Sequence, residues 1–137
     1  MLQIDLPNRE PSNLTMRSLT FWIPRIAAWL LAVTIIVLSV VPASLRPETD
    51  IPHSLEHFAA FFVTGAAFGF AYRRRAVAVA LALVLYSGLI ETIQLFVPDR
   101  HARLGDFIVD ALALSIGVAL ASIAGRALSA KVPNLVR

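Results

Sequence analysis

Cysteine is absent from the 137-residue chain, so disulfide bonds, thiolate metal ligands and cysteine nucleophiles are excluded. Charged residues are also scarce. They make up 15% of the chain, whereas a soluble protein normally carries about 25%. Apolar residues account for 58%, and the mean hydropathy is +0.74. Much of the surface is therefore expected to face lipid, and the composition predicts a multi-pass membrane protein. We expect it in the plasma (inner) membrane.

No alternation of apolar and polar residues is sustained over several segments, which argues against a transmembrane β-barrel. Instead, four apolar runs are each about long enough to cross a bilayer as a helix. They cover residues 22–41, 55–72, 76–97 and 106–124. Short loops join them, so the predicted fold is all-α, an antiparallel four-helix transmembrane bundle.

The first run is longer than the apolar core of a signal peptide and is therefore interpreted as a membrane span. Pro24 is expected in its first helical turn, where the missing N–H costs nothing. The expected division of the chain is a polar N-terminal tail over 1–20, a membrane domain over 21–126 and a basic C-terminal tail over 127–137.

The distribution of Lys and Arg predicts the orientation in the membrane. Nine of the twelve lie beside the termini or in the second connection, and three lie in the other two loops. Because cytoplasmic segments carry the excess of basic residues, both termini are expected in the cytoplasm. The cluster Arg73, Arg74 and Arg75 is interpreted as a topology determinant that touches anionic lipid head groups. Basic residues beside apolar runs are typical of membrane proteins, so no nucleic-acid partner is predicted.

Ionisable side chains are costly inside a bilayer, so those within the predicted spans need a reason. Helical spacing places them on three stripes, one on each of the last three helices: His53, His57, Phe61 and Thr64; Ser87, Glu91 and Gln94; Asp106, Asp110, Ala113 and Gly117. All three stripes reach the same, outer leaflet. If they face inward, they meet in one polar pocket that opens to the outside.

A purely structural interpretation stays open for each residue taken alone. An internal Glu or Gln can hydrogen-bond a neighbouring helix. Asp106 could cap the fourth helix, and Glu56 could reach solvent. For the whole set, with Arg100 and Arg103 in the adjoining loop, a functional site is the favoured hypothesis.

No cofactor and no metal site are predicted. His53 and His57 have the i, i+4 spacing of helical zinc ligands, but the motif H-E-x-x-H is absent.

Gly65 and Gly69 form a GxxxG motif, which allows helix backbones to approach closely. Packing within the bundle is the favoured interpretation, and an oligomer formed through these two glycines is the alternative.

Three stretches together resemble VanZ-like membrane proteins. Residues 55–61, followed by Gly65, are similar to the first signature of that family, a histidine with an aromatic residue four positions on. Residues 90–100 resemble the second, a Glu-x-x-Gln followed by proline and arginine. Residues 105–110, followed by Gly117, resemble the third, an Asp-x-x-x-Asn leading to a glycine. The resemblance covers residues 39–125 approximately, in one order and spacing.

The chain departs from the family pattern at several positions. His53 and Ser54 stand where Asp-Lys is frequent, Phe61 replaces a frequent tyrosine, and Asp110 replaces the usual asparagine. The family takes its name from resistance to the glycopeptide antibiotic teicoplanin. The resemblance therefore implies a role in the cell envelope, but it supplies no reaction.

The leading hypothesis is an envelope protein whose pocket binds a lipid-linked or cell-wall molecule, with membrane lipids as its other partners. Arg100 and Arg103 would hold an anionic group by charge-assisted hydrogen bonds. Gln94, Asp106 and Asp110 would complete the ligand-binding set.

Other classes of function stay open, and the sequence leaves undecided whether any reaction is catalysed. In an enzyme, His57 would act as general acid or base with Glu91 tuning it. A proton-coupled carrier and a structural partner of a larger membrane complex are further alternatives.

Overall fold

The computed structural model describes residues 11–41, 52–97 and 103–131, in which every regular element is a helix. The long helices are α1 (Pro11–Val40), α2 (His53–Ala71), α3 (Ala76–Gln94) and α4 (Leu104–Lys131). A short 3-10 turn, η2 (Arg73–Arg75), connects α2 to α3. All four long helices are long and apolar enough to cross a membrane. The predicted all-α, four-helix membrane fold is therefore confirmed.

The helices extend beyond the apolar runs that predicted them. α1 begins at Pro11 and α4 continues to Lys131, so parts of both expected tails are helical. Helical hydrogen bonds join backbone groups, so a helix can continue through polar residues beyond the membrane. Apolar composition identifies only the part of the helix that contacts lipid. As a result, Pro24 lies inside α1 and not in its first turn. Likewise, Asp106 lies in the first turn of α4 and is not its cap.

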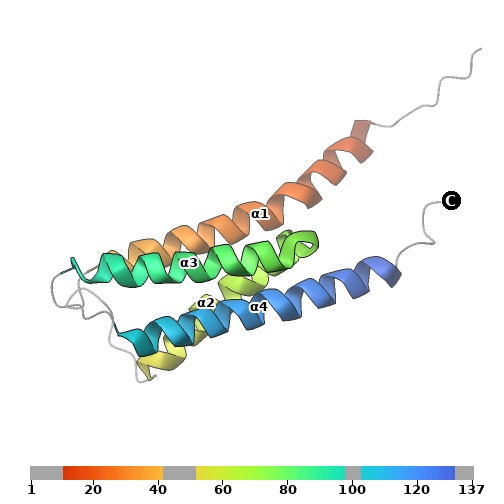
Figure 1. The fold of residues 1–137 in the computed structure, drawn as a ribbon. Helices are drawn as coiled ribbons and strands as arrows, with labels where there is room; N and C mark the ends of the chain where they lie inside the picture. The colour runs from red at the N-terminus through yellow and green to blue at the C-terminus, as the bar shows by residue number, and fades with distance from the viewer. Residues whose placement is uncertain (1–10, 42–51, 98–102, 132–137) are drawn as a thin grey trace, which may run out of the picture.

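The helices run up and down the bundle in chain order (Figure 1). The start of α1, the α2–α3 connection and the end of α4 lie at one end, which we call the basic end because it carries Arg73–Arg75. The other end carries every acidic residue that the structure describes, and we call it the acidic end. These residues are Glu56, Glu91, Asp106 and Asp110. Which end faces the cytoplasm stays a prediction.

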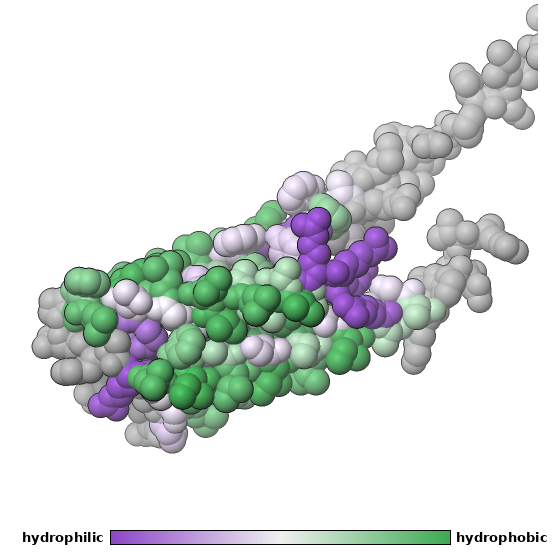
Figure 2. Space-filling view, viewed as in Figure 1, coloured by the Kyte–Doolittle hydropathy of each residue, from purple (hydrophilic) through white to green (hydrophobic). Residues whose placement is uncertain are grey.

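A broad apolar surface separates two hydrophilic zones along the molecule (Figure 2). Large side chains on it are strongly exposed, for example Val77 at 77% and Leu85 at 76%. Such a surface is stable in lipid and not in water. The chain is therefore a multi-pass membrane protein.

Helices α2 and α4 make the most extensive contact in the bundle because glycines lie between them. A Cβ added to Gly65 would overlap the backbone of Leu114, and one added to Gly69 would lie 2.7 Å from the Val118 Cα. A Cβ on Gly117 would in turn strike the backbone of α2. The GxxxG motif thus serves packing within the chain. An oligomer formed through it stays a prediction.

Helix α1 packs on the bundle through small buried residues. Ala28 and Ala32 are 0% and 4% exposed. The Tyr86 hydroxyl of α3 donates a hydrogen bond to the Ala32 carbonyl, and Trp29 Nε1 donates to the Tyr72 hydroxyl at 3.2 Å. These contacts hold α1 against both α2 and α3.

Candidate functional site

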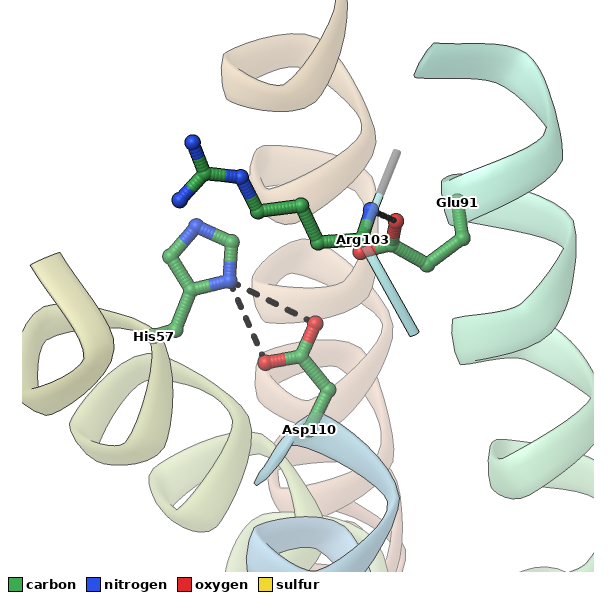
Figure 3. A network of polar contacts seen from close by, with 4 residues as sticks. All are labelled: His57, Glu91, Arg103 and Asp110. Carbon is green, nitrogen blue, oxygen red and sulfur yellow. Dashed lines mark hydrogen bonds and ion pairs between the residues drawn. The ribbon is translucent and has the colours of Figure 1, made fainter. Parts of the chain in front are cut away.

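His57 and Asp110 form a side-chain pair at the acidic end (Figure 3). The His57 Nδ1 lies 3.2 Å from one carboxylate oxygen of Asp110 and 3.4 Å from the other. The Asp110 side chain is fully buried, whereas that of His57 is 14% exposed. A carboxylate on Nδ1 selects the tautomer that carries its proton there, which leaves Nε2 as the ring atom directed away from Asp110.

The α2–α4 contact explains why these two side chains meet. His57 lies eight residues before Gly65 on α2, and Asp110 lies seven residues before Gly117 on α4. Eight and seven residues are each close to two helical turns, so His57 and Asp110 lie on the same faces as the two glycines. Close backbone packing at the glycines therefore brings the ring and the carboxylate within hydrogen-bond distance.

Helix α3 contributes two buried polar side chains beside this pair. Glu91 is 8% exposed and Gln94 is 3% exposed. The backbone N–H of Arg103 donates to Glu91 Oε2 at 3.2 Å, which ties α3 to the start of α4 (Figure 3). Within the described part of the chain, Glu91 Oε1 and Gln94 Nε2 have no hydrogen-bond partner. Such buried, unsatisfied atoms are rare in native proteins and call for an explanation.

The remaining predicted site residues are distributed around this cluster. Asp106 is half-buried and interacts electrostatically with both His57 and Glu91. The Arg103 guanidinium lies on the same side as the His57 ring in Figure 3. Arg100 lies outside the described residues, so its expected role in holding an anion stays a prediction.

Most described members of the three predicted stripes face the interior of the bundle. The buried members are Phe61, Thr64, Ser87, Glu91, Gln94, Asp110, Ala113 and Gly117, whereas His57 and Asp106 are partly buried. The buried hydroxyls of Thr64 and Ser87 donate to carbonyls of their own helices, at 2.9 Å each, and are thereby satisfied.

The structure adds a partner of His57 that the sequence did not predict. The carboxylate that hydrogen-bonds His57 is Asp110. The expected tuning of His57 by Glu91 stays a prediction. The sequence spacing of Asp106 and Asp110 predicted that both lie on one face of the fourth helix. No feature of the sequence predicted that Asp110 would contact His57.

The cluster can supply several kinds of chemistry. A histidine held by a buried aspartate can donate or accept a proton through its other ring nitrogen. The unpartnered Glu91 oxygen is an acceptor, and the unpartnered Gln94 amide nitrogen is a donor. Within the described ranges, no three His, Asp or Glu side chains are arranged to hold a metal ion.

Comparison with known proteins identifies the family of the chain. No curated protein and no solved structure matched the chain. The family model described as VanZ/LLP1 matches residues 7–125, which span most of the chain and contain every element of the cluster. This protein therefore belongs to the VanZ/LLP1 family.

Proposed function

We propose that this is a cell-envelope protein of the plasma membrane whose acidic end binds an anionic envelope molecule, either lipid-linked or part of the cell wall. The observation that carries the proposal is the pair of buried atoms Glu91 Oε1 and Gln94 Nε2, which have no partner among the described residues. Leaving buried polar groups unpaired costs stability, and such costs are typical of sites shaped for a ligand.

The chemistry of the cluster limits what the ligand can be. Arg103, with Arg100 as its predicted neighbour, suits a phosphate or carboxylate group. The Gln94 amide nitrogen can donate a further hydrogen bond to such a group. The Glu91 oxygen requires a hydroxyl or amide donor in return. A ligand with an anionic group next to hydroxyls or amides has the composition of lipid-linked and cell-wall precursors.

A glycopeptide-resistance role, which the family name implies, provides the first test. Expression in a teicoplanin-susceptible host should reduce susceptibility. Glu91→Leu should abolish this effect because it removes the oxygen that accepts a hydrogen bond from the ligand. Gln94→Leu should abolish it because it removes the amide that donates one. Gln94→Leu removes an unsatisfied buried group, so its free energy of unfolding should stay constant or rise by about 1 kcal/mol. Glu91→Leu also removes the acceptor of the Arg103 N–H, so no gain in stability is expected for it. Susceptibility assays, immunoblots of abundance and thermal unfolding in detergent measure these outcomes.

Thr92→Ala is the matched control on the same helix. Thr92 is exposed, and its hydroxyl donates to the Gly88 carbonyl within α3 at 2.8 Å. The control should keep the phenotype. Full resistance in Gln94→Leu at normal abundance would contradict the proposal, as would a host whose susceptibility does not respond to the wild-type protein.

A membrane-embedded enzyme is the second candidate, and the His57–Asp110 geometry favours it. In this role His57 would transfer a proton through Nε2 while Asp110 holds the ring. Lipid extracts from cells with the wild type and with His57→Gln would be compared by mass spectrometry. A modified envelope lipid that requires His57 would support catalysis, whereas identical profiles would exclude it and leave binding alone.

A further inference from the structure

A cleft of about 860 Å³ lies at the basic end, far along the bundle from the His57 cluster. One wall is formed by Thr20, Phe21, Pro24 and Arg25 of α1, and the other by the end of α2 and by η2. Pro24 lies inside α1, where it removes a helical hydrogen bond and favours a bend. In Figure 1 the N-terminal part of α1 leans away from the other helices, which leaves room for the cleft.

The cleft is strongly basic. Arg25, Arg73, Arg74 and Arg75 line it. All acidic residues that the structure describes lie at the other end, and no described carboxylate pairs with these arginines. Figure 2 shows a hydrophilic patch at this end of the molecule. Four guanidinium groups around one hollow, with no carboxylate beside them among the described residues, favour an anion, and guanidinium geometry suits phosphate.

Arg25 is held in place by neighbours on α1 and just after the end of α2. Its guanidinium lies 3.3 Å from the ring centroid of Phe21 and 5.1 Å from that of Tyr72, and Nη1 donates to the Phe21 carbonyl at 2.8 Å. Cation–π contacts of this kind fix a guanidinium without neutralising it. The other N–H groups of Arg25 have no acceptor among the described residues and can bind a ligand.

Exposed aromatic side chains lie in the cleft beside the arginines. Phe21 and Phe70 line it, and they are 52% and 42% exposed. A ligand with an anionic head and an apolar tail would place the head on the arginines and the tail against these two rings. Arginines and exposed apolar rings in one cleft favour a lipid over a soluble phosphate.

We propose that this cleft is a binding site for the phosphate head group of an anionic membrane lipid, formed jointly by Arg25 and Arg73–Arg75. The site is separate from the His57 cluster and does not depend on its function. A defined site predicts saturable binding of one lipid. General attraction between basic residues and an anionic membrane surface would not saturate at one lipid.

Native mass spectrometry of the full chain in detergent tests the proposal. The protein is titrated with phosphatidylglycerol or with phosphatidylcholine of the same acyl chains. We expect one phosphatidylglycerol to be retained at lipid concentrations where phosphatidylcholine is not. Arg25→Gln and Arg74→Gln should each weaken that binding about fivefold, as expected for one basic residue next to an anionic lipid surface. Arg74 is exposed, so its replacement should not affect folding.

Arg126→Gln is the matched control, because it removes the same charge from the same end. Arg126 does not line the cleft, and its guanidinium is engaged with the Arg73 carbonyl at 2.8 Å. It should leave the affinity for phosphatidylglycerol unchanged. Equal weakening by Arg126→Gln, no preference for phosphatidylglycerol, or displacement of the lipid by an equal concentration of glycerol phosphate would each overturn the proposal.

Discussion

At the scale of single residues, the central feature is a histidine held by a fully buried aspartate within the span of the membrane. Asp110 stands where the family resemblance leads one to expect asparagine. Both residues offer an oxygen that can accept a hydrogen bond from the His57 Nδ1 proton. The geometry of the pair, at 3.2 Å, therefore requires an acceptor at this position but does not require a negative charge.

Two substitutions of Asp110 separate these contributions. Asp110→Asn keeps the acceptor and should leave the free energy of unfolding nearly unchanged. Asp110→Leu removes the acceptor of the His57 Nδ1 proton and should lower that free energy by about 1–3 kcal/mol. Thermal unfolding of both variants in one detergent measures the difference. Equal destabilisation by the two changes would show that the charge of Asp110, and not its hydrogen bond, holds the ring.

At the scale of helices, the α2–α4 contact positions the site. The two helices meet backbone to backbone at Gly65 and Gly117, and His57 and Asp110 lie about two turns from these contacts. Side chains normally keep two helix backbones apart, and small residues such as glycine allow the backbones to approach closely. A change in helix separation at the glycines is therefore transmitted to the distance between the ring and the carboxylate.

Gly65→Ala tests this dependence. The new Cβ would overlap the Leu114 backbone, which cannot move away as a side-chain tip could. We expect the free energy of unfolding to fall by about 1–3 kcal/mol, as in other overpacked interiors, together with loss of the resistance phenotype. Thermal unfolding and the susceptibility assay provide the two readouts.

Gly88→Ala is the matched control on α3. Its Cβ would lie 3.5 Å from the Phe107 ring, which is ordinary van der Waals contact. Alanine also favours helix over glycine by up to about 1 kcal/mol, so this variant should be neutral or more stable. If Gly65→Ala behaves like Gly88→Ala, the α2–α4 spacing does not control the site.

At the scale of the whole molecule, charge is divided between the two ends. The described acidic residues lie at one end, and Arg73–Arg75 lie at the other together with the start of α1 and the end of α4. The positive-inside rule predicts that the basic end faces the cytoplasm. The His57 cluster would then lie toward the cell exterior.

Single cysteines can test this orientation, because the chain has none of its own. Gly105 and Ala130 are exposed near opposite ends of α4, and a Cβ on Gly105 would meet no atom within 4 Å. Gly105→Cys should react with a membrane-impermeant maleimide in intact cells. Ala130→Cys should react only after the membrane is permeabilised. The reverse labelling pattern would invert the predicted topology.

The number of spans and the inward-facing polar stripes followed from the sequence alone. Hydropathy and helical period are local properties, so 22–41 and 76–97 could be recognised as spans, and Glu91 and Gln94 as one face, without knowledge of the fold. The ends of the helices did not follow from hydropathy. For example, the polar residues 11–20 belong to α1 although they lie outside the apolar run that predicted it.

Only the tertiary structure decided which side chains meet. The sequence placed His57, Glu91 and Asp110 at similar depth but could not choose the carboxylate that bonds His57, because that choice depends on helix separation and rotation. The basic cleft joins Arg25 to Arg73–Arg75 from separate helices for the same reason. Periodicity along one helix determines a face, whereas contacts between faces arise only when the helices pack.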